Sequence, residues 1–455
     1  MPEPRQIRLN ALDQCTPSFL AFGLWAHERD RALDYTKLGY WLDYARLLER
    51  GKFDALFLAD IIGVPDVFEG GPDAAFRAGA LAPSLDPSAI VAAMATVTRN
   101  LGFAITGSAS YEVPYLFARR MATLDHLTEG RLGWNIVTGF LNSGARAMGE
   151  AGLGAHDARY DAADSFVDVV TALWDKSWAP GAVLRDKATG RFADPSKIAI
   201  IERDGPHHRI HAAGPTEPSP QRVPVLFQAG GSPRGRDFAA THAEGIFVNG
   251  PKLPLVAEQV TDIRARAAAF GRDPRAIRFF AGASIIVAET RSLAEARARD
   301  YQRMASVEGM LAQLSAALGI DLARYPLDEP IRYEETDAAR SQLEMLTRKG
   351  QVTIRQMAES MILSGRNVTL IGTPSEIADT MTEWVEQGDV DGFNVARILA
   401  HETMEAVVDL LVPELQRRGL FKEDYAPGTL REKLRSDPPE GPAAREAAPR
   451  VAAPA

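Results

Sequence analysis

Eight short apolar runs recur along the chain, separated by longer stretches with helical periodicity. The runs are rich in β-branched and aromatic residues, which favour β-strands. Strands that are apolar on both faces are typical of a parallel sheet covered by helices, and eight such units favour a closed (β/α)₈ TIM barrel of the α/β class over an open doubly wound sheet. The runs are IRLNAL (7–12), FDALFLAD (53–60), LGFAITGSAS (101–110), RLGWNIVT (131–138), VPVLFQAG (223–230), GIFVN (245–249), IRFFAGASIIVA (277–288) and DGFNVARIL (391–399).

The chain is longer than such a barrel needs. A barrel takes about 250 residues, whereas this chain has 455. We therefore predict a single barrel domain over residues 1–435 with insertions at about 176–224 and 301–366, the second of which we expect to cover a pocket. Residues 436–455 are rich in proline, alanine and charge without a core-forming pattern, which predicts a disordered tail.

Composition narrows the function classes. The net charge of −9 argues against a nucleic-acid partner, because such binding depends on clustered Lys and Arg. The single cysteine, Cys15, cannot form an internal disulfide, which is typical of a reducing compartment. We find neither a signal peptide nor an apolar run long enough to span a bilayer. The sequence thus predicts a soluble, cytoplasmic protein with no membrane or nucleic-acid partner.

Polar residues lie at the carboxyl ends of several predicted strands, where barrel enzymes have their catalytic and binding residues. These residues are Asp60, Thr106, Ser108, Asn135 and Thr138. Each could also be a helix cap or a turn residue. Their joint occurrence favours convergence on one mouth of the barrel.

The segment QAGGSPRGRDF has the features of an anion site. A strand runs into Gly230, Gly231 and Ser232, and a helix is predicted to begin near Arg234, so free backbone N–H groups and a hydroxyl would face an anion such as a phosphate monoester. Arg234 and Arg236 add positive charge. The alternative is a glycine-rich turn carrying two solvated arginines.

Two histidine-containing stretches allow more than one interpretation. His207, His208 and His211 could bind a metal in a hydrolase, but residues at this spacing in a short surface strand need not share a partner. His156 and Tyr160 lie four residues apart, so on a helix they share one face and could both reach a ligand. They could equally be half-buried packing residues.

Longer strings carry a resemblance to a known family. The strings are GLWAHERDRALDYTKLGYWLDYARLLERGKFDALFLAD, YLFARRMATLDHLTEGRLGWNIVTGFLNSGARAMG, LFQAGGSPRGRDFAATHAEGIF and LVPELQRRGLF. From residue 5 to about 435 the chain resembles the nitrilotriacetate monooxygenase component A branch of the bacterial luciferase-like flavin monooxygenases. Relatives in this branch include EDTA, dibenzothiophene sulfone and long-chain alkane monooxygenases. The resemblance implies a barrel that binds reduced FMN and uses dioxygen as co-substrate.

The resemblance also implies roles for particular residues. Gly231 and Ser232, with His156 and Tyr160, match positions that hold the FMN phosphate. Asp60 matches a position on the ring side of the flavin.

Two further positions are predicted to be catalytic by the resemblance. Thr106 matches a flavin-contacting position, and Asn135 resembles an asparagine beside the reactive edge of the flavin ring. The hypothesis is that both donate hydrogen bonds that hold dioxygen or the flavin–oxygen adduct against that edge. Gly139 and Gly144 are expected to leave room for cofactor or substrate.

The source of electrons is inferred separately. The chain has no GxGxxG motif after a strand and no second nucleotide-binding unit, which implies a separate NAD(P)H:FMN reductase as partner. A small organic substrate and a homodimer or homotetramer are expected, without a specific substrate. Three alternatives stay open: an F420-dependent oxidoreductase of the same superfamily, a metal-dependent barrel hydrolase, and a non-catalytic flavin-binding protein.

Overall fold

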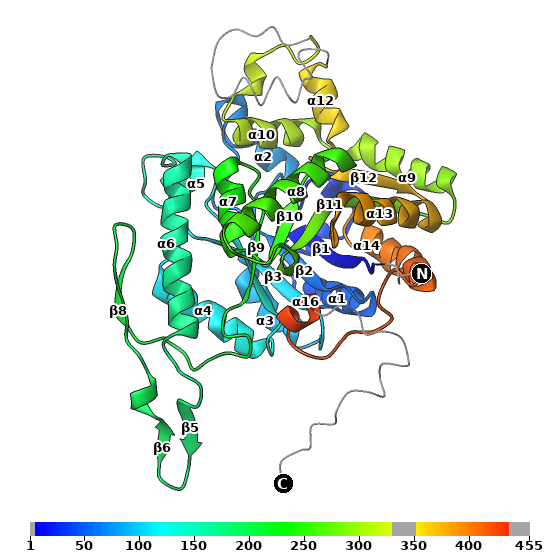
Figure 1. Cartoon of the computed structure of the whole chain (residues 1–455). Helices are drawn as coiled ribbons and strands as arrows, with labels where there is room; N and C mark the ends of the chain where they lie inside the picture. Colours follow the sequence, from blue (N-terminus) through cyan, green and yellow to red (C-terminus); the bar gives the residue numbers. More distant parts are fainter. Residues whose placement is uncertain (1–4, 330–351, 436–455) are drawn as a thin grey trace.

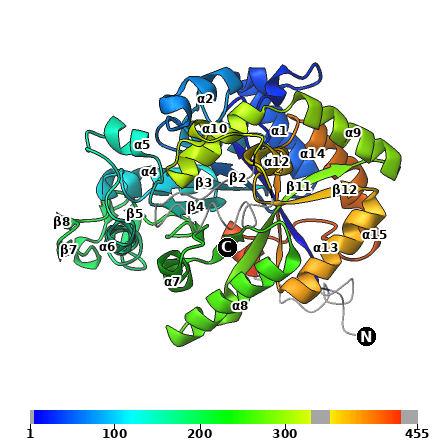
Figure 2. The ribbon, with the colours of Figure 1, turned by 90° about the horizontal axis from the view of Figure 1, so that it is seen from above.

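The centre of the molecule is a closed barrel of eight parallel strands surrounded by helices (Figures 1 and 2). The computed structural model describes residues 5–329 and 352–435. Going round the barrel, β1 is followed by β2, β3, β4, β9, β10, β11 and β13, which pairs with β1 again. The strands are β1 (Arg8–Gln14), β2 (Ala55–Ala59), β3 (Gly102–Ser108), β4 (Leu132–Val137), β9 (Val225–Gln228), β10 (Gly245–Val248), β11 (Arg278–Val287) and β13 (Gly392–Ala396). Each overlaps one of the eight apolar runs, and all but β1, which extends to Gln14, lie entirely within theirs, so the predicted fold class is confirmed.

Strand β2 shows why these runs are apolar throughout. Leu56 and Leu58 pack outward into the cluster between the sheet and the helices, whereas Phe57 packs inward with Phe227 and Phe280. The rings of Phe57 and Phe227 lie 5.9 Å apart, and those of Phe227 and Phe280 lie 6.3 Å apart. Because successive side chains point to opposite faces, burial of both faces requires a continuous apolar run.

Capping residues fix where several helices begin. Asp86 accepts a hydrogen bond of 2.8 Å from the backbone N–H of Ser88, and Thr373 forms a reciprocal capping box with Glu376. Among the described residues, no helix is both long enough and apolar enough to cross a membrane. The helices are α1 (Leu38–Arg50), α2 (Asp73–Ala78), α3 (Pro87–Ala95), α4 (Pro114–Leu127), α5 (Asn142–Ala147), α6 (His156–Asp175), α7 (Pro233–His242), α8 (Leu253–Ala269), α9 (Arg291–Met304), α10 (Val307–Leu318), α12 (Ile354–Ser360), α13 (Pro374–Gly388), α14 (Glu402–Ala406), α15 (Val412–Arg417) and α16 (Leu430–Arg435).

One strand of the main sheet was not predicted. Strand β12 (Val368–Gly372) pairs only with β11, along residues 283–287. The first four residues of the ten-residue β11 pair with β10, and residues 280–284 pair with β13. Because β12 joins β11 beyond the end of the β10 pairing, it extends the sheet without entering the ring.

The remaining segments lie at the ends and side of the barrel. Two antiparallel hairpins, β5 (Val183–Asp186) with β6 (Arg191–Ala193) and β7 (Ile201–Asp204) with β8 (Arg209–Ala212), extend away from the barrel beside α6 (Figure 1). Helices α10 and α12 lie together with α2 at one end of the barrel (Figure 1). Residues 330–351 of the second predicted insertion and the predicted tail at 436–455 lie outside the described residues.

Candidate functional site

A cavity of about 1220 Å³ opens at the carboxyl ends of the barrel strands. Its walls come from the segments that follow β1 to β4, β9 and β10, and from α10. All seven residues predicted for the site line this one cavity; they are Asp60, Thr106, Asn135, His156, Tyr160, Gly231 and Ser232. The strand order explains the convergence, because parallel strands that close into a barrel bring their carboxyl ends to one face.

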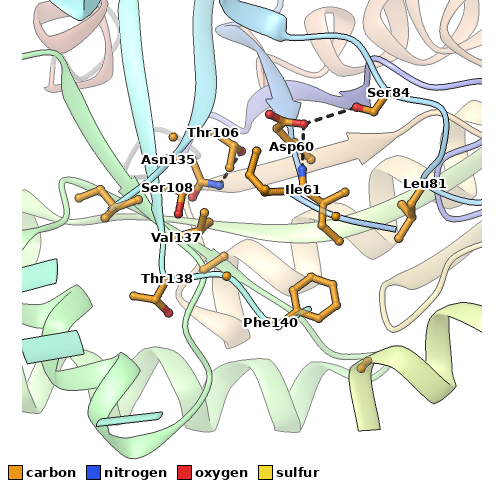
Figure 3. Close-up of a pocket in the computed structure, with 18 of the residues that line it drawn as sticks. Asp60, Ile61, Leu81, Ser84, Thr106, Ser108, Asn135, Val137, Thr138 and Phe140 are labelled. Atoms are coloured by element: carbon orange, nitrogen blue, oxygen red, sulfur yellow. Dashed lines mark hydrogen bonds between the residues drawn. The ribbon is translucent and has the colours of Figure 1, made fainter. Parts of the chain in front are cut away.

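Thr106 and Asn135 lie side by side in the cavity wall (Figure 3). They are register partners on β3 and β4, and the amide of Asn135 donates a 2.9 Å hydrogen bond to the Thr106 hydroxyl. The side-chain amide oxygen of Asn135, Oδ1, is buried without a hydrogen-bond partner among the described residues. Since the Thr106 oxygen accepts from Asn135, its own proton is directed elsewhere. In this geometry Asn135 orients the Thr106 hydroxyl, and the second N–H of the Asn135 amide is not used by this hydrogen bond.

The glycine–serine loop after β9 forms a cradle at the start of α7. Ser232 caps that helix through a 3.0 Å hydrogen bond from the N–H of Gly235, and its hydroxyl lies 3.3 Å from Nε2 of His156. A side chain at Gly235 would come within 2.7 Å of the Tyr160 hydroxyl, so the glycine leaves that hydroxyl its place. A Cβ at Gly231 would meet nothing within 4 Å, so this part of the loop faces open space. A helix N-terminus with two hydroxyls and an imidazole fits a phosphate group.

The two arginines predicted to aid this cradle do not line the cavity. Arg234 forms ion pairs with Asp161, at 2.9 Å, and with Asp164. Arg236 pairs with Asp262 at 2.9 Å and donates to the carbonyl of Gly231. Both guanidinium groups are thus held by carboxylates of α6 and α8, which corrects the expectation from the sequence.

Arg159 supplies a cation at the cradle that the sequence reasoning missed. It lies in the cavity wall beside Tyr160, and its Nε is buried without a partner among the described residues. Its Nη1 donates to the carbonyl of Gly154 at 2.5 Å. The spacing of three residues from His156 on one helix could have indicated it, because such residues share a face.

Asp60 directly follows β2, and Thr106 lies on the neighbouring strand β3 (Figure 3). Its carboxylate accepts a 2.8 Å hydrogen bond from the N–H of Ile61 and a long one, of 3.5 Å, from Ser84. Burial raises the pKa of Asp60 to about 6, and the negative charges of Asp86 and Glu112 add to this shift. This carboxyl can therefore exchange a proton near neutral pH.

The cluster of histidines does not form a metal site in this structure. His208 lies 3.0 Å from the hydroxyl of Ser165 on α6, whereas His211 is exposed and faces Glu202 at 3.8 Å. In the described part of the chain, no group of three or more potential ligand side chains is placed to hold a metal ion. The interpretation as a surface strand agrees with β8, which contains His211.

Comparison with known proteins places the chain in a family. The family model described as luciferase-like monooxygenase matches residues 19–391. The chain belongs to this family. Dimethyl-sulfide monooxygenase of Hyphomicrobium sulfonivorans is 41% identical over 94% of this chain and 90% of its own length. Long-chain alkane monooxygenase of Geobacillus thermodenitrificans is 41% identical over 94% of each chain.

Two further proteins are similar to the chain along most of its length. Nitrilotriacetate monooxygenase component A of Aminobacter aminovorans is 35% identical over 94% of this chain and 96% of its own length. A crystal structure of riboflavin lyase with modified FMN and riboflavin has a TM-score of 0.87 and 36% identity, and covers 94% of this chain and 96% of that one. As a member of the family, the chain is a flavin-dependent monooxygenase, and the predicted recognition is confirmed.

Proposed function

We propose that this luciferase-like enzyme is the oxygenase component of a two-component system. It takes FMNH₂ from a separate NAD(P)H:FMN reductase and uses dioxygen to oxygenate a small organic substrate. When bound, reduced FMN supplies the two electrons with which one oxygen atom is transferred to the substrate and the other leaves as water. The observation that carries the proposal is that one cavity joins a phosphate cradle to the Thr106–Asn135 pair.

Each part of the cavity has a task in this proposal. Ser232, Gly231, His156 and Tyr160 bind the phosphate, and Arg159 adds positive charge there. Asp60 lies against the flavin ring. These contacts hold the ring in one orientation, so that its reactive edge meets the wall formed by β3 and β4.

The Thr106–Asn135 pair is the proposed catalytic feature. Asn135 orients the Thr106 hydroxyl, which donates a hydrogen bond to dioxygen at the ring edge. Ile105 and Ile136 are buried on the helix-facing side of β3 and β4, so bulk water cannot reach the pair from behind the strands, and a hydrogen bond counts for more in such a site.

Component A in the name of the nitrilotriacetate relative supports a separate reductase. The FMN in the riboflavin lyase structure supports FMN as the flavin. We also propose that the enzyme works in the cytoplasm, where NAD(P)H is available, and as a homodimer or homotetramer.

The test combines the purified enzyme with FMN, NADH, a flavin reductase and isotope-labelled dioxygen. We expect label in the product, and no turnover when F420 replaces FMN. Thr106→Val removes the hydroxyl at nearly constant volume and should lower the yield of oxygenated product on the order of 100-fold. The affinity for FMN should change little.

A second variant of the pair and a control variant complete this test. Asn135→Ala should cause a similar loss, whereas Ser292→Ala, on the exposed first turn of α9, should behave as the parent enzyme. Full oxygenation by Asn135→Ala with unchanged FMN binding would refute the catalytic role of the pair. Turnover with F420 alone would favour the alternative cofactor.

A further inference from the structure

Beyond the proposed flavin site, the cavity has a second region with different chemistry. We infer that this region takes an uncharged organic substrate with a mainly hydrocarbon surface, such as a thioether or an alkyl chain, and excludes polycarboxylates. The inference rests on the proposed function, because it concerns the molecule that is oxygenated beside the flavin.

The cavity is large enough for two ligands. Its volume of about 1220 Å³ exceeds the roughly 300–1000 Å³ that is usual for a single small-molecule site. The proposed phosphate cradle and Arg159 occupy the end formed by α6, β9 and the start of α7. The rest is bounded by the segment after β1, by β2 and β10, and by α10.

The walls of this second region form one continuous apolar surface. The rings of Phe57 and Phe247 lie 6.3 Å apart, at the level of the barrel strands. Phe19 from the segment after β1 and Leu314 from α10 belong to the same hydrophobic cluster, and Met361 after α12 packs against it. All five line the cavity. A ligand with an apolar surface would cover these side chains, and the favourable free energy of binding would grow with the apolar area removed from water.

The charges around the cavity disfavour a polyanion. Among the described lining residues, Arg120 is paired with Glu112, and Arg159 lies at the proposed phosphate end. Arg366 is exposed on the turn between α12 and β12. Asp60 and Asp86 add two carboxyl groups to the described lining, whereas the charges of Glu112 and Arg120 offset each other. In the described part of the lining, a substrate with two or three carboxylates would meet Asp60, Asp86 and the exposed cation of Arg366, and burial of an uncompensated carboxylate is costly.

The polar groups in the apolar region are uncharged amides. Gln313 on α10 is half-buried, and Asn249 and Asn367 also line the cavity. An amide can donate to one weak acceptor, such as a thioether sulfur, or be covered by hydrocarbon at modest cost. On such a substrate, one atom of dioxygen is added to sulfur or inserted into a C–H bond. The other atom becomes water, and the flavin supplies two electrons and two protons.

The test compares two molecules that share a core and differ in charge. Dibutyl sulfide and thiodipropionate both have a central thioether, but only the latter carries carboxylates. In the reconstituted system, kcat/KM for the sulfide should exceed that for the diacid on the order of 100-fold, because the site does not compensate the carboxylates. Binding of each compound to the FMN-loaded enzyme is measured in parallel by thermal shift.

Variants at one position locate the effect. Gln313→Arg places a cation in the apolar region and should raise binding and turnover of thiodipropionate while lowering those of the sulfide. Gln313→Leu is the matched control and should keep the sulfide as substrate. FMN affinity should be the same in all three enzymes, because α10 lies away from the proposed phosphate cradle.

The outcomes separate this inference from the proposed function. An enzyme that binds and oxygenates the diacid as well as the sulfide overturns the substrate class, and so does failure to bind either compound while FMN binds normally. Absence of FMN binding and of FMNH₂ oxidation overturns the proposed function itself.

Discussion

Asp60 is an acid placed where ionisation is unfavourable. Burial raises its pKa to about 6, and Asp86 and Glu112 add to the shift. An ordinary aspartate has a pKa of about 4. Folding therefore favours the protonated form between about pH 4 and pH 6, and the ionised form destabilises the folded enzyme above that interval.

Asp60→Asn should remove this pH-dependent penalty. Below about pH 4, Asp60 is protonated in both the folded and the unfolded enzyme. The difference in unfolding free energy between the variant and the parent should therefore not change with pH in that range. As the pH rises to about 7, the parent should lose up to about 3 kcal/mol relative to the variant, less any screening by water at the cavity. Urea unfolding at several pH values measures the difference. Glu28→Gln, at an exposed position, is the control, and a difference that is constant with pH would contradict the assignment.

At the scale of elements, the segments after β2 and β4 are joined by hydrogen bonds and pack closely beside the cavity. Ser143 donates a 2.7 Å hydrogen bond to the carbonyl of Val64 and accepts one of 3.1 Å from its N–H. A Cβ at Gly144 would lie 2.2 Å from the carbonyl oxygen of Ile62. Gly63, at φ +103°, has the left-handed conformation that favours glycine. The predicted role of Gly144 is thus corrected, since it makes room for a backbone segment.

Gly144→Val should separate these two segments and admit water to the cavity. An overlap of this kind usually costs about 1–3 kcal/mol when the backbone must shift. Because water competes with productive transfer of oxygen, we expect more hydrogen peroxide per NADH consumed and a lower yield of product. The ratio of peroxide to product measures this directly. Gly154→Ala is the matched control, because a Cβ there meets nothing within 4 Å. An unchanged ratio in Gly144→Val would show that the contact is dispensable.

These elements also show what the sequence could predict. The eight strands were found because burial on both faces leaves an apolar run that can be read locally. Strand β12 was missed because its five residues alternate between buried positions and positions that are exposed or half-buried, and make no long apolar run. The partners of Arg234 and Gly144 lie about 70 to 80 residues away, and tertiary packing alone brings them together. Strand ends were predictable, whereas contacts between distant segments were not.

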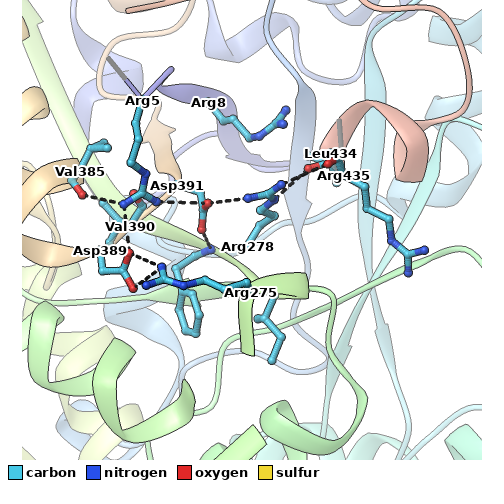
Figure 4. Close-up of polar contacts among 12 residues, drawn as sticks. Arg5, Arg8, Arg275, Arg278, Val385, Asp389, Val390, Asp391, Leu434 and Arg435 are labelled. Atoms are coloured by element: carbon cyan, nitrogen blue, oxygen red, sulfur yellow. Dashed lines mark hydrogen bonds and ion pairs between the residues drawn. The ribbon is translucent and has the colours of Figure 1, made fainter. Parts of the chain in front are cut away.

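At the scale of the whole molecule, polar contacts at the end of the barrel opposite the cavity join the first and last described segments of the chain to the strands (Figure 4). Arg278 on β11 donates to the carbonyl of Leu434 in α16 and pairs with Asp391 at 3.0 Å. Arg5, near the amino end, pairs with Asp389 at 3.0 Å. In barrels, the amino ends of the strands contribute to stability and the carboxyl ends to function. The two tasks are thus expected to be separable in this enzyme.

Arg431 is the residue that tests this separation. Its guanidinium contacts both oxygens of Glu244, at 2.8 and 2.9 Å, and donates to the carbonyl of Val223 at 2.7 Å. Burial alone would raise the pKa of Glu244, but pairing with Arg431 and Arg435 holds this pKa below its usual value. Loss of Arg431 would leave a largely buried carboxylate with weaker compensation.

Arg431→Met should therefore lower the free energy of unfolding by roughly 3 kcal/mol, measured by urea denaturation at neutral pH. The double variant with Glu244→Gln should recover part of that loss, because no unpaired charge remains. Arg435→Met, whose side chain is 61% exposed, should cost less than about 1 kcal/mol. The kcat/KM of correctly folded Arg431→Met should equal that of the parent enzyme, since the cavity lies at the other end of the barrel. A fall in kcat/KM without a loss of stability would show instead that this end of the barrel is coupled to the cavity.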